Sequence, residues 1–234
     1  MSKYLLTVAG FDPTGGAGII RDSLVFFHEG FIPLAVPTAW TVQDGKKVYG
    51  FVPLPPEYVK HALSLMLDKK PPGVKIGMVG SEEIVKVLYE LLKNFEGMII
   101  FDPVIHASGG ESLFEGNIDA FFMLFSISHV ITPNRKEGEL LTGLKKPEEV
   151  VKKLKEKTKG TVVLTGSGDY DLVYDGERMI KIEGKKIPAS LHGSGCRFSS
   201  YMLSFLVRGV SVEEAVKKAR RKVEEEIEKE GDRD

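Results

Sequence analysis

The chain of 234 residues is poor in the features that mark several large protein classes. It holds one cysteine, Cys196, which excludes a framework of intramolecular disulfides. The opening sequence MSKYLLTVAGFDP contains no long apolar stretch of the kind found in a signal peptide. We therefore expect a soluble, cytoplasmic protein that does not bind a membrane.

Charge of either sign is also not in excess. Lys and Arg total 32 against 33 Asp and Glu, which gives a net charge of -1. This balance gives no electrostatic reason to expect a nucleic-acid partner, and an anionic ligand must be held by local geometry. Hydrophobic residues make up 42% of the chain, enough to fill a sizeable core. One domain covering residues 1–234 is the expectation.

Short apolar runs alternate with amphipathic stretches, and this order is typical of an α/β protein. It predicts a three-layer α/β/α fold in which helices cover both faces of a mainly parallel sheet. A hairpin is expected where two short runs flank the turn Asp175-Gly176. The predicted strands are Tyr4–Ala9, Ile32–Val36, Val74–Ile76, Met98–Phe101, Val130–Ile131, Thr161–Leu164, Asp171–Tyr174 and Met179–Glu183. The predicted helices are Ile19–His28, Pro56–Leu67, Ser81–Asn94, Lys136–Leu141, Pro147–Lys157, Phe198–Val207 and Val212–Glu228.

The sequence His192-Gly193-Ser194-Gly195-Cys196 precedes an apolar helix. Ligands of open α/β sheets bind beyond the carboxyl ends of the strands, and small residues at a helix start let backbone amides surround an anion. A thiol at this place is expected to have a lowered pKa and to accept a proton or position a nucleophile. The alternatives are an ordinary tight turn and a buried apolar cysteine.

The first glycine-rich loop, Asp12 to Gly18, has neither the Lys-Ser/Thr pair of a Walker A loop nor the G-x-G-x-x-G spacing. A wall or lid of a substrate pocket fits it better. Asp22 follows in the next helix and is a candidate to bind a substrate hydroxyl or ring amine. Gln43 is a candidate to pair with an aminopyrimidine edge through its amide donor and acceptor. A solvated position is the alternative for each.

Oxygen-bearing side chains follow two predicted strands. Asn134 and Glu137 lie three residues apart at a helix start, where an amide and a carboxylate can hold hydrated Mg²⁺ beside a triphosphate. An N-cap Asn with Glu three residues later is equally a capping box. Asp102 directly follows the strand Met98–Phe101 and is a further candidate to bind a metal or a phosphate-bound water.

Taken together, these motifs resemble the hydroxymethylpyrimidine and hydroxymethylpyrimidine phosphate kinases of thiamin biosynthesis, a branch of the ribokinase-like superfamily. The resemblance extends from Leu6 to about Ala219. It rests on VAGFDPTGGAGIIRD near the start, the segment around Gln43, KIGM at 75–78, FDPV at 101–104, TPNRKEGELL at 132–141 and HGSGC at 192–196. The ribokinase-like fold, ATP and Mg²⁺ as cofactors and a homodimer are what the resemblance implies.

The resemblance also assigns roles to individual residues. It places Gly10, Asp22, Gln43, Met78 and Val104 around the pyrimidine. The turn Gly193, Ser194, Gly195 and Cys196 would hold the transferring phosphoryl group, and Cys196 stands where most ribokinase-like enzymes have a catalytic Asp. Asn134 and Glu137 would manage Mg²⁺, and the residues assigned to the nucleotide and its phosphates are Asp102, Thr132, Asn134, Thr165 and Arg197.

Two expected lysines are absent. Relatives usually read A-K-S-G where this chain has Ala107-Ser108-Gly109-Gly110, and K-G-G-H where it has Thr165-Gly166-Ser167-Gly168. Arg197 is a candidate to replace part of this charge, with a surface-pointing side chain as the alternative. The leading prediction is ATP-dependent phosphorylation of hydroxymethylpyrimidine, its monophosphate or both. The rivals are a pyridoxal or pyridoxine kinase and a catalytically weak pyrimidine-binding protein. The apolar segment Val48–Pro55 is a candidate edge strand for a dimer.

Overall fold

The computed structural model describes residues 3–107, 109–166, 169–184 and 192–231. A nine-stranded sheet runs through this part of the chain in the order β11-β10-β9-β8-β6-β4-β1-β2-β3. Five neighbouring pairs, from β2 to β9 across the sheet, are parallel, and the pairs β2–β3, β9–β10 and β10–β11 are antiparallel. The predicted mainly parallel sheet is confirmed.

The strands of this sheet are β1 (Tyr4–Phe11), β2 (Ile32–Gln43), β3 (Val48–Pro53), β4 (Gly73–Ile76), β6 (Met98–Phe101), β8 (Val130–Ile131), β9 (Thr161–Leu164), β10 (Tyr170–Tyr174) and β11 (Met179–Glu183). A separate two-stranded sheet joins β5 (Gly80–Ser81) to β7 (Phe114–Glu115). The helices are α1 (Gly18–His28), α2 (Pro56–Leu67), α3 (Glu82–Leu92), α4 (Phe121–Ile127), α5 (Arg135–Thr142), α6 (Pro147–Lys155), α7 (Ser194–Leu206) and α8 (Val212–Gly231), with a 3₁₀ turn, η1, at Ile118–Ala120.

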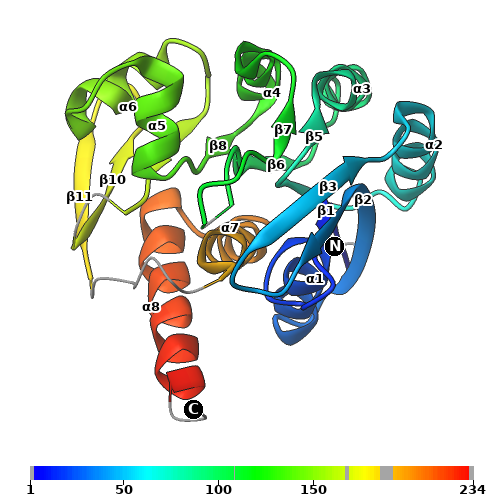
Figure 1. Cartoon of the computed structure of the whole chain (residues 1–234). Coiled ribbons are helices and arrows are strands. Elements are labelled where there is room, and N and C mark those ends of the chain that lie inside the picture. The colour runs from blue at the N-terminus through cyan, green and yellow to red at the C-terminus, as the bar shows by residue number, and fades with distance from the viewer. Residues whose placement is uncertain (1–2, 108, 167–168, 185–191, 232–234) are drawn as a thin grey trace.

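Helices lie on both faces of the sheet, as the three-layer prediction requires (Figure 1). Helices α2 to α6 line one face, and α1, α7 and α8 line the other. Two clusters of buried apolar side chains fill the spaces between the layers, one beneath each set of helices. Apolar burial on both faces explains why the central strands are continuous hydrophobic runs without alternation.

Local sequence accounts for several element ends. The Ser81 hydroxyl accepts a hydrogen bond from the Ile84 amide and caps α3. Asn134 and Glu137 cap α5 reciprocally, and α5 ends at Gly143, which adopts a left-handed conformation with φ of 72°. Gly176 (φ 110°) makes the predicted turn between β10 and β11.

Most predicted bounds differ from the observed ones by a few residues, and three elements differ for a clear physical reason. Strand β2 continues from Val36 to Gln43, because it gains β3 as an antiparallel neighbour along its second half. Helix α7 begins at Ser194 and not at Phe198, so the glycine-rich turn enters its first turn. Helix α4 was not predicted, since its sequence FFMLFSI is apolar almost throughout and shows no clear period.

Candidate active site

A cavity of about 540 Å³ opens beyond the carboxyl ends of the parallel strands. Most of the side chains and turns predicted for the site line it, although they come from segments far apart in the chain. They are Gly10, Gln43, Met78, Asp102, Val104, Thr132, Asn134, Glu137, Thr165, Gly193, Ser194, Gly195 and Cys196. The structure does not place Asp22 or Arg197 in the wall of this cavity.

The first turn of α7 faces the cavity. The amides of Ser194, Gly195 and Cys196 have no carbonyl partner within their own helix, because they belong to its first turn. Gly193 precedes them with φ of 75°, and a Cβ at this position would overlap the carbonyl oxygen of Gly16. The turn therefore packs against the first glycine loop. It presents backbone donors and the positive end of the helix dipole to an anion.

A second contact joins the same two loops. His192 Nε2 lies 2.7 Å from Asp12 Oδ2. The same carboxylate accepts hydrogen bonds from the amides of Thr14 and Ala17, so it shapes the first glycine loop. Burial alone would raise the pKa of Asp12, but the bonds from His192, Thr14 and Ala17 lower this pKa to about 2. Asp12 is therefore ionised at neutral pH and holds both loops.

Cys196 lines the cavity, as predicted. Its expected lowered pKa is wrong. Burial raises the pKa of the thiol to about 11, although the Lys75 ammonium and the Gly18 amide act in the opposite direction. Since the helix start does not outweigh desolvation, the group is a neutral thiol at pH 7. It can donate a hydrogen bond to an acceptor alcohol, but it is a poor base.

Asp22 is fully buried and does not reach the cavity, so its predicted contact with the substrate is wrong. Its carboxylate pairs with the Lys75 ammonium at 2.9 Å. It also accepts hydrogen bonds from Thr7 at 2.6 Å and from Ser200 at 2.9 Å. Burial would lower the pKa of Lys75, but Asp22, Cys196 and Asp102 raise it above its ordinary value. A charged pair thus lies beneath the first turn of α7.

Arg197 is also buried, with 2% of its surface exposed, because it points away from the cavity and towards α8. Its Nε lies 3.0 Å from Glu226 Oε2, and its Nη1 donates to the His192 carbonyl. The predicted role as a replacement cation for the nucleotide is therefore wrong. Arg197 instead ties the turn before α7 to the last helix.

Gly10, Met78, Val104 and Gln43, which were predicted to surround the ring, all line the cavity. A Cβ at Gly10 would lie 2.6 Å from the Met78 sulfur, so the absence of a side chain at residue 10 gives Met78 its place. Thr38 donates a 2.6 Å hydrogen bond to the Met78 carbonyl and fixes that segment. Met78 and Val104 belong to one apolar cluster, and Gln43 adds an amide beside it. We call this part of the cavity the ring slot, because apolar walls with one hydrogen-bonding group suit a flat heteroaromatic ring.

Carboxylates gather at another wall of the cavity. Burial raises the pKa of Asp102 to about 6, and burial together with Asp102 raises that of Glu137 to about 8. Asn134 Oδ1 accepts from the Glu137 amide, and Glu137 Oε2 accepts from the Asn134 amide. The capping box that was the alternative for this pair is thus confirmed. The Thr132 hydroxyl is buried beside them and has no hydrogen-bond partner among the described residues.

These groups fit Mg²⁺. The Thr132 hydroxyl has no hydrogen-bond partner in the described part of the chain, and the buried carboxyl groups of Asp102 and Glu137 have raised pKa values. A hydrated divalent cation beside them would bind the hydroxyl oxygen and would favour the ionised form of both carboxyl groups. Among the described residues no group of three or more His, Cys, Asp or Glu side chains forms a complete cage. A cation at this wall would therefore depend on water and phosphate oxygens for the rest of its ligands, as Mg²⁺ commonly does.

The far end of the cavity was not anticipated. Arg220 from α8 and Asp171 from β10 both line it, and their Nη1 and Oδ2 atoms lie 2.7 Å apart. Asp171 also accepts from the Gly166 amide, next to Thr165. Thr165 is held by backbone bonds to Pro133 and Arg135. The segments where the two lysines are missing include Ser108, Ser167 and Gly168, which lie outside the described residues.

Sequence reasoning missed Asp12, Lys75, His192 and Arg220. Lys75 offered a signal, since a lysine between Val74 and Ile76 interrupts a strand expected to be buried. Arg220 offered none, because α8 carries many basic residues and only the packing against β10 distinguishes one of them.

Comparisons with known proteins agree with this geometry. The family model described as Phosphomethylpyrimidine kinase matches residues 12–233. A hydroxymethylpyrimidine/phosphomethylpyrimidine kinase from Aquifex aeolicus is 37% identical over 237 residues, which cover 95% of this chain and 93% of the relative. The structure is similar to the phosphomethylpyrimidine kinase of Clostridium difficile, with a TM-score of 0.84, 28% identity and coverage of 96% and 99%. It is also similar to a pyridoxal kinase from Staphylococcus aureus in complex with pyridoxal, with a TM-score of 0.86, 29% identity and coverage of 95% and 86%.

Proposed function

Because this chain belongs to the phosphomethylpyrimidine kinase family, we propose that it transfers the γ-phosphoryl group of ATP to the hydroxymethyl group of 4-amino-5-hydroxymethyl-2-methylpyrimidine, to its monophosphate, or to both. The observation that carries the proposal is the cavity. It joins a slot for a flat ring to a helix N-terminus that presents backbone donors and the Cys196 thiol.

Phosphoryl transfer requires in-line placement and neutralisation of charge more than covalent chemistry by the protein. The amides of Ser194, Gly195 and Cys196 would bind the oxygens of the transferring group, and each such donor contributes about 3–4 kcal/mol to transition-state stabilisation in other enzymes. The neutral Cys196 thiol would orient the acceptor alcohol. The proton of that alcohol would pass to an oxygen of the transferring phosphoryl group late in the transfer, because a thiol with a pKa of about 11 is already protonated at pH 7 and cannot accept it.

Magnesium is part of the proposal. Asp102 and Glu137 would hold it, directly or through water, with the Thr132 hydroxyl and the Asn134 side chain beside them. Bound Mg²⁺ would neutralise the phosphate charges. The pair Arg220–Asp171 and the Thr165 backbone would border the nucleotide at the far end of the cavity.

A pyridoxal kinase is the second candidate function, and the similarity to the Staphylococcus aureus pyridoxal kinase supports it. Its named ligand, pyridoxal, also presents a hydroxymethyl group on a nitrogen heteroaromatic ring. A catalytically weak pyrimidine-binding protein is supported only by the missing lysines at the positions noted in the sequence.

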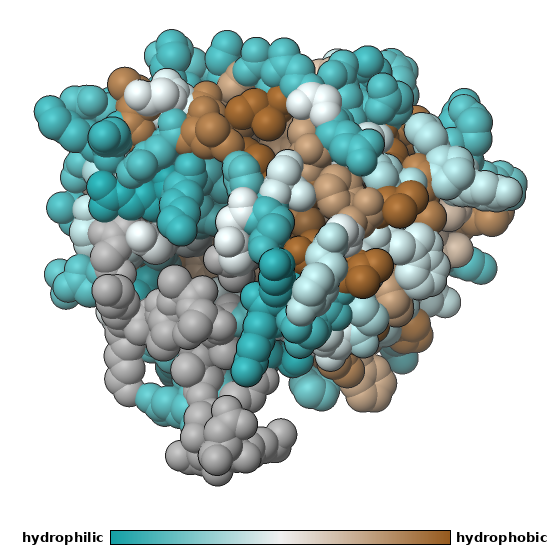
Figure 2. All heavy atoms as spheres, viewed as in Figure 1, coloured by the Kyte–Doolittle hydropathy of each residue, from teal (hydrophilic) through white to brown (hydrophobic). Residues whose placement is uncertain are grey.

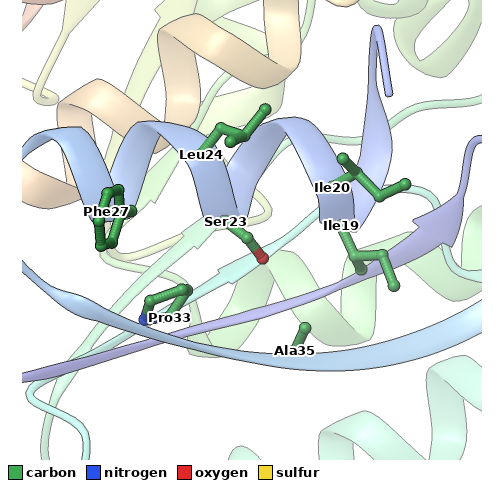
Figure 3. A pocket seen from close by; sticks show the side chains of 7 residues that line it. All are labelled: Ile19, Ile20, Ser23, Leu24, Phe27, Pro33 and Ala35. Carbon is green, nitrogen blue, oxygen red and sulfur yellow. The ribbon is translucent and has the colours of Figure 1, made fainter. Parts of the chain in front are cut away.

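A single domain over residues 1–234, a cytoplasmic location and a homodimer complete the proposal. None of the helices in the described part of the chain combines the length and the apolar character that crossing a bilayer requires. Support for a dimer comes from a shallow groove between α1 and β2. It is lined by Ile19, Ile20, Ser23, Leu24, Phe27, Pro33 and Ala35 (Figure 3).

The sheet ends beside this groove. Strand β3 is its last strand, and Val42, Tyr49 and Val52 near this edge are each about two-thirds exposed. Figure 2 shows brown and pale atoms gathered where β2 and β3 lie in Figure 1, among teal neighbours. An exposed edge strand with apolar side chains is a common site of pairing between chains.

The test is a coupled assay of ADP formation with ATP, Mg²⁺ and each alcohol in turn. We expect turnover with the aminopyrimidine alcohol or its monophosphate and a kcat/KM at least tenfold lower with pyridoxal. The reverse preference would assign the second function. Binding of the pyrimidine by calorimetry with no ADP formed would assign the binding protein.

A further inference from the structure

The side chain of Gln43 is the one amide in the ring slot, and either of its two ends has nearly the same shape. Which end faces the ligand decides whether the slot offers an acceptor or a donor. Thr41 and Gln43 both line the cavity, and Val42 between them is exposed. The contacts of Thr41 settle the orientation.

Thr41 has one hydroxyl proton and two possible neighbours. Its Oγ1 lies 2.9 Å from the carbonyl oxygen of Phe11, which can only accept. The hydroxyl proton is therefore committed to Phe11. Gln43 Nε2 lies 2.6 Å from the same Oγ1, so Thr41 Oγ1 must accept a hydrogen bond from the amide. Only the NH₂ end of Gln43 can do so, because the carbonyl end would set two acceptors against each other.

The surrounding backbone holds in place this relay, the two hydrogen bonds from Gln43 to Thr41 and from Thr41 to the Phe11 carbonyl. Thr41 is 8% exposed and pairs with Phe51 across the β2–β3 ladder. The β1–β2 ladder is irregular between Ala9 and Phe11, and the Thr41 hydroxyl binds the Phe11 carbonyl there. A second irregularity between Val42 and Gln43 precedes the amide. Among the described residues, Gln43 Oε1 accepts no hydrogen bond, so it remains for a ligand.

We propose that Thr41 is a specificity-determining positioning residue, because its relay to Phe11 locks Gln43 with the acceptor Oε1 towards the ring slot. The favoured ligands are flat heteroaromatic alcohols that present a hydrogen-bond donor, such as an exocyclic amino group, to this oxygen. A ring with an oxo group at the same place would set acceptor against acceptor. This inference rests on the proposed function, since it takes the slot as the site of the acceptor alcohol.

The test compares two ring systems of equal shape. One is 4-amino-5-hydroxymethyl-2-methylpyrimidine, and the other is its analogue with a 4-oxo group in place of the amino group. A mismatched buried hydrogen bond changes affinity by about 10- to 100-fold, so we expect wild type to favour the amino compound by that factor in kcat/KM and in calorimetric Kd.

Thr41→Val keeps the shape of the side chain and removes the hydroxyl, which frees the Gln43 amide to rotate by half a turn. We expect the preference to fall to a few-fold, mainly through a lower KM for the oxo analogue. Thr41→Ser retains the relay and is the matched control, for which the wild-type preference should persist. Circular dichroism and a melting curve establish that both variants fold.

Equal affinity of wild type for the two rings would overturn the inference, as would an unchanged preference in Thr41→Val. Failure of the proposed function has a different signature. Wild type would then bind the pyrimidines with the stated preference without forming ADP, and the calorimetric comparison would still decide the role of Thr41. Binding of neither ring would overturn both.

Discussion

At the residue scale, the buried pair Lys75–Asp22 sets the charges beneath the first turn of α7. Both side chains are completely inaccessible, and Asp22 is further bonded by Thr7 and Ser200. Gly77 makes room for this arrangement, because a Cβ there would lie 2.8 Å from Lys75 Nζ. Removing one partner of such a pair costs about 3–5 kcal/mol, since the other charge is left buried alone.

The charges of this pair reach Cys196 with opposite effects on its pKa. Lys75 lowers that pKa and Asp22 raises it. Cys196 is the one cysteine of the chain, so alkylation by iodoacetamide reports this thiol alone. Since the pKa is about 11, the thiolate fraction and the rate should rise about tenfold per pH unit between pH 7 and pH 10.

At pH 8.5 we expect Lys75→Met to slow the alkylation by roughly tenfold, because loss of the ammonium raises the pKa of the thiol, and Asp22→Asn to accelerate it. If the substitutions only loosened the fold, Cys196 would be alkylated faster in both variants, and that outcome would contradict the electrostatic account. Lys86→Met removes a partly exposed pair with Glu82 and is the control, with an unchanged rate. Mass spectrometry of the single adduct gives the measurement.

At the scale of elements, α7 carries most of the candidate chemistry. Its first turn lines the cavity, its face towards α1 holds Ser200 against Asp22, and Arg197 binds helix α8. The helix is also bounded by two glycines with positive φ, Gly193 at 75° and Gly209 at 82°. Only Gly193 is crowded, because nothing lies within 4 Å of a Cβ at Gly209.

These two glycines form a matched pair for substitution. Alanine at Gly209 should destabilise the fold by about 1–2 kcal/mol, the cost of a left-handed conformation, and alanine at Gly193 by more, because its Cβ would also overlap the Gly16 carbonyl oxygen. Gly193→Ala should also displace the first glycine loop and reduce kcat by about 100-fold or more, as loss of an anion-hole donor does. Gly209→Ala should retain wild-type turnover. Urea denaturation and steady-state kinetics separate the two effects, and equal kcat values for both variants would refute the assignment.

At the scale of the whole molecule, the sheet separates two unequal helical layers, and the apolar groove lies on the side of α1 (Figures 1 and 3). Leu24 and Phe27 are 41% and 67% exposed in this groove, beside Pro33 of β2. A second copy of the chain would remove this surface from water.

We therefore expect wild type to sediment as a dimer at micromolar concentration. Phe27→Glu should shift it to a monomer, because the charge would be buried in an apolar interface. Tyr58→Glu on α2 is the control, since Tyr58 is 72% exposed but lies on the other layer. A monomeric wild type, or dissociation by both variants, would contradict this interface. Sedimentation velocity gives the measurement.

Much of the fold was predictable because each central strand carries its own signal. The run Met98–Phe101 and the helix Pro56–Leu67 were predicted with their observed bounds. The site was predictable where it depends on backbone, as at Gly193 to Cys196. It was not predictable where it depends on the environment of a side chain. Asp22 and Arg197 are polar residues close to the site in sequence, yet packing turns both away from the cavity.

Sequence patterns alone fixed the layer order, the parallel strands and the glycine turns, because hydrophobic periodicity and left-handed glycines act over a few neighbouring residues. The tertiary structure decided which charged groups meet and whether the Cys196 thiol is ionised. Desolvation raised the pKa of the Cys196 thiol, and burial joined Lys75 to Asp22 across 53 positions. It also set Arg220 against the cavity. Electrostatic energies depend on what surrounds a group in space, and residues distant in the chain supply those surroundings.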